Sequence, residues 1–159
     1  MPVAAGGGDN AAGAVGAGVV RPGEAFLSLG TSGVLFAVDD RFRPNPKRAA
    51  HAFCHALPGV WHQMAVLLSA ASCLAWAARA TGAADEAALL AEIEAAPPTP
   101  GILLFLPYLS GERTPHNDPD ARGAFFGVDH DTTRAALGRA VLEGVAFAFA
   151  DAQEVLLEA

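Results

Sequence analysis

The feature that most restricts the fold of this chain is a pair of apolar runs separated by a short turn. Residues 25–30 and 33–38 are rich in branched and aromatic side chains, and the letters GTSG at 30–33 join them. Glycine at both ends of so short a connection is typical of a β-hairpin. The sequence therefore predicts two antiparallel strands at this point.

A second hairpin and several helices are expected beyond the first hairpin. Residues 51–57 and 61–68 are strand-like and flank a Pro-Gly turn. Helical spacing of apolar residues and end signals predict the remaining elements. Helices are expected at 10–18, 69–80, 85–95 and from 133 onward, and short strands at 102–106 and 124–128. The mixture of hairpins and packed helices predicts an α/β fold.

The composition narrows the class of protein. The chain has 159 residues, 52% of them hydrophobic, and a net charge of −7 from 10 basic and 17 acidic side chains. With no basic patch, we expect no nucleic-acid partner. No apolar run is long enough for a membrane span, so we expect no membrane partner. Cys54 and Cys73 do not form a disulfide framework, which favours reduced thiols and a cytoplasmic location.

One carboxylate, Asp9, lies among small residues in the stretch AGGGDNAAGAVG. Glycine permits close approach of a ligand to the backbone. From the residues alone, Asp9 is a helix cap at or near the N-terminus of the following helix, a metal ligand or a base. The turn at 30–33 also has two interpretations. It is an ordinary hairpin turn, or its N–H groups and hydroxyls receive a phosphate.

Five segments resemble the xylulokinases of the FGGY carbohydrate kinase family, and they occur in the order of that family. They are GGGDNAAGAVG, LSLGTSGVLFAV, HAFCHALPGVWHQM, LLSAASCLAWAA and FLPYLSGERTPHNDPDARGAFFG. The resemblance extends from Pro2 to Glu158. It implies an α/β fold, a truncated ribonuclease-H-like domain of the actin and hexokinase type with antiparallel hairpins and packed helices.

The resemblance also implies a reaction and its residues. The family transfers the γ-phosphoryl group of ATP, with Mg²⁺, to a sugar, here D-xylulose to give D-xylulose 5-phosphate. Asp9 matches the catalytic base, and Asp9 and Asn10 match the sugar contacts. Asn10 favours xylulose, because glycerol kinases tend to carry Gln after the Asp. The ATP phosphates would bind at the turn formed by Gly30, Thr31, Ser32 and Gly33. No residue is assigned to a metal.

Further polar residues have open interpretations. Glu112, Arg113, Thr114 and Pro115 match a signature loop of the family, with a structural or a functional role. The side chains of Glu112 and Arg113 are expected either to pair with each other or to contact a ligand. The histidines 51, 55 and 62 are expected to be core or surface residues, with a metal site as the alternative. Cys73 is expected to be a packed thiol.

The resemblance divides the chain at residue 22. Residues 1–22 are interpreted as the tail of the family's N-terminal domain, and 23–159 as a truncated C-terminal domain. We therefore expect the isolated chain to be inactive and to expose apolar surface that drives self-association into a dimer. The alternatives are a kinase of another sugar or polyol of the same family, or a non-catalytic binding or assembly module.

Overall fold

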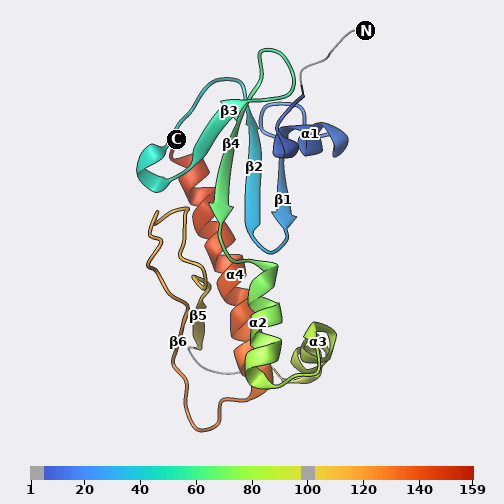
Figure 1. The fold of residues 1–159 in the computed structure, drawn as a ribbon, viewed down its shortest axis with the longest axis vertical. Helices are drawn as coiled ribbons and strands as arrows, with labels where there is room; N and C mark the ends of the chain where they lie inside the picture. The colour runs from blue at the N-terminus through green and yellow to red at the C-terminus, as the bar shows by residue number, and fades with distance from the viewer. Residues whose placement is uncertain (1–5, 98–102) are drawn as a thin grey trace.

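The computed structural model describes residues 6–97 and 103–159, and the elements follow the order that the sequence predicts. Figure 1 shows their arrangement. The helices are α1 (Asp9–Gly16), α2 (Ala71–Thr81), α3 (Glu86–Ala95) and α4 (Arg134–Leu157), with a 3₁₀ turn at Pro46–Arg48. The strands are β1 (Ala25–Leu29), β2 (Gly33–Asp39), β3 (His51–Cys54), β4 (Trp61–Leu67), β5 (Leu104–Leu106) and β6 (Ala124–Phe126).

Both predicted hairpins are confirmed and combine into one antiparallel sheet. The strand order is β1-β2-β4-β3, so each hairpin supplies one edge strand and one central strand. In the register between the two central strands, β2 and β4, Gly33 pairs with Leu67 and Asp39 pairs with Trp61. A separate pair, β5 and β6, lies beside α4 in the lower part of Figure 1.

The sheet lies between two helices because its apolar side chains alternate. Leu35 and Ala37 of β2 point to the face covered by α4, where they meet Ala152. Phe36 and Val38 point to the other face, where they pack with α1. Because successive side chains of β2 point to opposite faces, the strand is apolar on both faces. The sheet is therefore the middle of three layers, between α4 and α1.

The long helix α4 connects the two halves of the molecule. Its N-terminus is capped by Thr133, whose side chain accepts a hydrogen bond from the N–H of Ala136. The C-terminal half covers the sheet, and the N-terminal half contacts α2, α3 and β5 (Figure 1). Val141 in the N-terminal half and Val155 in the C-terminal half are fully buried, so one side of α4 is apolar along both halves.

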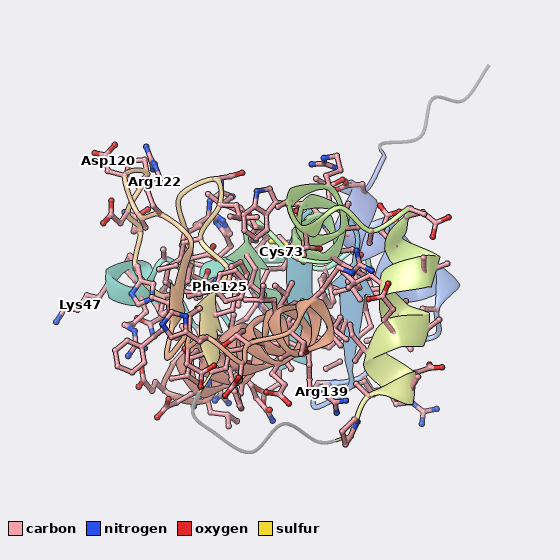
Figure 2. The ribbon with its side chains drawn as sticks, turned by 90° about the horizontal axis from the view of Figure 1, so that it is seen from below. Lys47, Cys73, Asp120, Arg122, Phe125 and Arg139 are labelled. Atoms are coloured by element: carbon pink, nitrogen blue, oxygen red, sulfur yellow. The ribbon has the colours of Figure 1, made fainter. Side chains whose placement is uncertain are left out.

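A second core lies around the N-terminal half of α4. It contains Cys73 and Ala77 of α2, Leu89 and Ile93 of α3, Phe105 of β5, and Val141. Figure 2, seen from below, shows Cys73 and Phe125 toward the middle and Lys47 and Asp120 at the rim. Leu89 and Ile93 therefore form the inner face of α3.

Small differences from the predictions have local causes. The helix predicted from residue 69 begins at Ala71, and Gly82 ends it with a φ of 75°, a conformation that glycine adopts without strain. The predicted start of β5 at Ile102 lies outside the described residues. Within 6–97 and 103–159, no helix is long and apolar enough to cross a membrane.

Candidate functional site

Asp9 is the first residue of α1, and its carboxylate is not used as a helix cap. Gly8 occupies the N-cap position, and no side chain makes a capping hydrogen bond there. One carboxylate oxygen, Oδ1, accepts from the backbone N–H of Asn10 at 2.8 Å and from its side-chain Nδ2 at 3.4 Å. Asp9 makes no ion pair with any described residue, so the carboxylate is available at the surface.

A pocket of about 340 Å³ lies beside Asp9. The beginning of α1 forms one side, and two strands form the other. Its lining residues are Gly8, Asp9, Asn10 and Ala11 of the α1 region, Phe53 and Cys54 of β3, and His62 and Met64 of β4. Asp9 and Asn10 therefore line the same pocket. The resemblance did not point to the β3 and β4 side chains, although alternation along residues 61–67 puts His62 and Met64 on one face.

His62 is the imidazole that the sheet contributes to this pocket. It is only 4% exposed, and its ring stacks on Phe36 with 4.4 Å between the ring centroids. Burial, followed by the nearby His55, lowers the pKa of His62 to about 4. The pocket wall opposite Asp9 is therefore a neutral imidazole at pH 7.

The turn between β1 and β2 is held by the beginning of α2. The N–H of Ala70 donates to the carbonyl of Thr31 at 3.0 Å, and the N–H of Ala71 donates to the carbonyl of Gly30 at 2.9 Å. The hydroxyl of Ser72 also donates to the Thr31 carbonyl, at 2.7 Å. The carbonyl groups of the turn are therefore occupied by the protein itself.

Two amide groups of the same turn have no acceptor among the described residues, whereas the N–H of Gly30 donates to the Ser32 carbonyl at 3.0 Å. No described residue accepts a hydrogen bond from the N–H of Thr31 or Ser32, and both residues are exposed. Backbone amides and hydroxyls are donors of the kind that bind an anion, so the phosphate interpretation of the turn stays a prediction.

Gly33 has a packing role in the structure. A Cβ atom added at Gly33 would lie 2.5 Å from Cζ of Phe149 on α4 and 3.1 Å from the Cβ of Ala70. At Gly30, by contrast, the nearest atom would be the Ser32 carbonyl oxygen at 3.6 Å. The glycine at position 33 therefore allows α4 and α2 to approach the turn closely.

The two predicted parts of the site lie at different places on the sheet. The turn precedes β2, whereas His62, which lines the Asp9 pocket, pairs with Val38 near the other end of β2. Figure 1 shows the β1–β2 turn at the lower end of the sheet and α1 toward its upper end. The pocket beside Asp9 contains no residue of the turn.

In the signature loop, the side chains of Glu112 and Arg113 bind other groups and not each other. Glu112 is 1% exposed, and its carboxylate accepts backbone N–H groups, from Leu68 at 2.9 Å and from Arg113 at 2.7 Å. The expected ion pair between the Glu112 and Arg113 side chains is wrong, since the Arg113 guanidinium lies 3.4 Å from Nε2 of His51. Burial, and then the charge of Arg113, lowers the pKa of His51.

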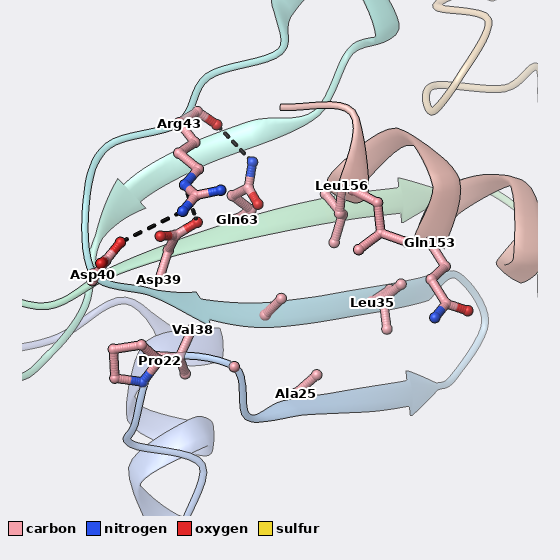
Figure 3. Close-up of a pocket in the computed structure, with 13 residues that line it drawn as sticks. Pro22, Ala25, Leu35, Val38, Asp39, Asp40, Arg43, Gln63, Gln153 and Leu156 are labelled. Atoms are coloured by element: carbon pink, nitrogen blue, oxygen red, sulfur yellow. Dashed lines mark hydrogen bonds and ion pairs between the residues drawn. The ribbon is translucent and has the colours of Figure 1, made fainter.

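A larger pocket, about 570 Å³, lies elsewhere (Figure 3). It lies between the β1–β2 hairpin and the end of α4. Its charged groups already bind one another, since Arg43 pairs with Asp39 at 3.0 Å and with Asp40 at 3.6 Å. Gln63 donates to the Arg43 carbonyl at 2.7 Å. None of the predicted site residues lines it, so the Asp9 pocket is the better candidate.

The histidines do not gather into a metal centre. Nδ1 of His55 accepts from the N–H of Leu57 at 3.2 Å, and His51 lies beside Arg113. The part of the chain that the structure describes has no group of three or more His, Cys, Asp or Glu that could hold a metal ion.

Solved structures share this fold. A protein described as a xyloylose kinase from Brucella ovis superposes with a TM-score of 0.92 and is 56% identical, covering 97% of this chain and 32% of its own. The xylulose kinase from Rhodospirillum rubrum gives a TM-score of 0.83 at 33% identity. The fold is therefore the α/β type of the actin and hexokinase class, as predicted.

Sequence comparison identifies the family within that class. Residues 25–159 match the C-terminal domain of the FGGY family of carbohydrate kinases. The xylulose kinase of Escherichia coli is 58% identical over 156 residues, which are 98% of this chain and 32% of the relative. The chain belongs to the FGGY family of carbohydrate kinases. It spans about a third of the length of the curated relatives that it matches.

Proposed function

We propose that this chain supplies the base and the phosphate-binding turn of an ATP-dependent D-xylulose kinase. The observation that carries the proposal is the exposed, unpaired Asp9 at the mouth of a pocket. It occurs in a chain 58% identical to a xylulose kinase over 98% of its length. The division into residues 1–22 and 23–159 remains a prediction, although α1 packs on the sheet through Ala14.

The proposed chemistry uses the two parts of the site separately. Asp9 accepts the proton of a sugar hydroxyl while that oxygen forms a bond to the γ-phosphorus. The bond between the γ-phosphorus and the bridging oxygen breaks, and ADP leaves. The free amides of Thr31 and Ser32 bind phosphate oxygens. Phosphoryl transfer depends mainly on such positioning, and a general base adds roughly 10²–10⁴-fold.

The donor set is compatible with a magnesium ion that is held by the nucleotide. Mg²⁺ usually keeps several waters and binds substrate phosphates with one or two carboxylates, so it requires no protein cage. The described residues offer Asp9 as a carboxylate without an ion-pair partner. When bound, Mg²⁺ neutralises charge on the phosphate oxygens.

A chimera tests the reaction. The matching segment of the Escherichia coli relative is replaced by this chain, and ADP release is measured with D-xylulose, glycerol and gluconate. We expect D-xylulose to be preferred and Asp9→Asn to lower kcat by roughly 10²-fold or more. Asp151→Asn, an exposed change on α4, serves as the matched control. Full activity of the Asp9→Asn chimera contradicts the base assignment, and preference for another substrate contradicts D-xylulose.

Nucleotide binding is tested on the 159-residue chain itself. Calorimetric titration with Mg-ADP and Mg-ATP is compared between the unchanged chain, Thr31→Ala and Ser28→Ala. We expect binding that weakens in Thr31→Ala and is retained in Ser28→Ala, because Ser28 lies on β1 outside the turn. Equal affinity in all three proteins would contradict the turn as the phosphate site. We expect this chain alone to release no ADP from ATP with D-xylulose.

Self-association and location are part of the same proposal. An apolar groove of about 440 Å³ lies beside the edge strand β1. Leu27 and Leu29 line it from β1, and Leu142 lines it from α4. We expect two copies of the chain to meet at this groove. Leu142→Glu should then give monomers by light scattering, whereas Phe147→Glu, outside the groove, should not. A monomeric unchanged chain at high concentration would contradict self-association at this groove.

Two free cysteines support the cytoplasmic location.

A further inference from the structure

The last residues of β4 lack a strand partner on one side. Strand β2 accompanies β4 from Trp61 to Leu67. Strand β3 accompanies it only from Trp61 to Met64. The backbone groups of residues 66 and 68 on the β3 side therefore need other partners, because buried amides are almost always hydrogen-bonded.

The signature loop supplies these partners. The N–H of Val66 donates to Oγ1 of Thr114 at 3.0 Å, and the N–H of Thr114 donates to the Val66 carbonyl at 3.1 Å. Two residues further along, the N–H of Leu68 donates to Oε1 of Glu112 at 2.9 Å. The loop replaces β3 at the edge of the sheet.

Glu112 is held firmly in this position. Its backbone N–H and carbonyl exchange hydrogen bonds with Asp118, both at 2.8 Å. Its side chain is 1% exposed, and Oε2 has no hydrogen-bond partner in the described part of the chain. Burial raises the pKa of Glu112 despite the hydrogen bonds from Leu68 and Arg113. A glutamine could therefore replace the carboxyl group with the acceptor oxygen kept.

The residue that Glu112 binds leads directly into the support of the turn. Two residues after Leu68 comes Ala70, the N-cap of α2, and the amides of Ala70 and Ala71 donate to the carbonyl groups of Thr31 and Gly30. Leu68, which donates to Glu112, is therefore only two residues before Ala70, the first residue whose amide holds the turn. A shift of residues 68–71 would move the Thr31 carbonyl and with it the free amide of Ser32.

We propose that Glu112 is a positioning residue that fixes the junction between β4 and α2 and thereby orients the turn at residues 30–32. The inference rests on the proposed function only in taking that turn as the phosphate site. Thr114 differs from Glu112 because it binds Val66, within β4 and further from α2. Glu112 therefore governs nucleotide affinity, whereas Thr114 governs stability alone.

Amide hydrogen exchange on the 159-residue chain tests the positioning without any nucleotide. Glu112→Met removes the acceptor, Glu112→Gln keeps it, and Thr114→Val removes the neighbouring hydroxyl. In Glu112→Met, we expect the Ala70 and Ala71 amides to exchange about tenfold faster than in the unchanged chain. The exchange rates of the α4 amides should be the same in both proteins. Glu112→Gln should behave as the unchanged chain. Thr114→Val should affect Val66 and leave Ala70 and Ala71 protected.

Unchanged exchange at Ala70 and Ala71 in Glu112→Met would overturn the inference, as would equal acceleration in Thr114→Val. If Glu112→Met does not fold, Glu112→Asp, which withdraws the carboxylate by one methylene group, is measured against the same expectations.

Titration with Mg-ADP separates this inference from the proposed function. If the unchanged chain binds, Glu112→Met should weaken binding about tenfold and Glu112→Gln should restore it. In the chimera, the KM for ATP should rise while the KM for D-xylulose stays constant. If the unchanged chain binds no nucleotide but exchange at Ala70 and Ala71 responds, positioning by Glu112 stands. The phosphate role of the turn then fails.

Discussion

The hydroxyl of Ser72 donates a hydrogen bond of 2.7 Å to the carbonyl oxygen of Thr31, which lies 41 residues earlier in the chain. The carbonyl of Thr31 also accepts the N–H of Ala70. This oxygen is therefore doubly bound to the beginning of α2, and the turn has its carbonyl groups turned toward the helix. The amides of Thr31 and Ser32 have no acceptor among the described residues.

Removing the Ser72 hydroxyl should loosen the turn without unfolding the protein. We expect Ser72→Ala to lower the free energy of unfolding by about 0.5–1.5 kcal/mol, since one hydrogen bond is lost and the carbonyl keeps another partner. Urea denaturation measures the change, and Mg-ADP titration should show weaker binding. Ser110→Ala, at an exposed loop position, is the control. Equal stability of both variants would mean that this contact does not hold the turn.

Gly33 should tolerate no side chain, because its space is already filled. A methyl group at this position would overlap Phe149, so we expect Gly33→Ala to destabilise the protein by about 1–3 kcal/mol. The double variant Gly33→Ala with Phe149→Leu should recover part of this loss. Gly30→Ala, where a methyl group has room, should change the free energy of unfolding much less. Equal losses at positions 30 and 33 would contradict a packing role for Gly33.

The low pKa of His62 predicts a pH dependence of stability. The folded protein lowers this pKa from 6.5 to about 4, so the unfolded chain binds the proton more tightly. The stabilisation is complete above pH 6.5 and is lost as the pH falls toward 4. His62→Gln should therefore show a flatter dependence of the unfolding free energy between pH 6.5 and 4.5, by about 1–2 kcal/mol. Parallel curves for the two proteins would contradict this.

The fold was largely predictable because its signals are local. The alternation along residues 33–39 and the turn at 30–33 specify the first hairpin, and Thr133 marks the beginning of α4. The glycine-rich surroundings single out Asp9 and the turn, and the family resemblance gives each an expected role. What the sequence could not give is contact between distant segments. Glu112 binds Leu68 across 44 residues, and no spacing rule connects the two.

Local patterns also left the chemistry of single residues undecided. The adjacent letters of Glu112 and Arg113 suggested an ion pair, because opposite charges attract. In the structure, the backbone amides of Leu68 and Arg113 both donate to Oε1 of this carboxylate. Similarly, the alternation of His51 and His55 suggested neighbours on one strand face. The strand ends at Cys54, and Nδ1 of His55 accepts a hydrogen bond from the N–H of Leu57.

The two cysteines should differ sharply in reactivity. Cys54 is exposed in β3, whereas Cys73 is fully buried in α2, where its Sγ lies 3.7 Å from the Pro107 carbonyl. Burial, and then the charge of Glu112, raises the pKa of Cys73 to about 12, so almost no thiolate forms at pH 8. Since the thiolate is the reactive form, the native protein should consume one equivalent of a thiol reagent.

The second equivalent should react only after denaturation, and Cys54→Ser should abolish the native reaction. Glu112→Gln removes the nearby charge but not the burial, so Cys73 should stay unreactive in that variant as well. Rapid labelling of Cys73 in the native chain would mean that the core between α2 and β5 opens on the timescale of the reagent. The Glu112 loop, which packs beside it, would then be too mobile to fix the turn.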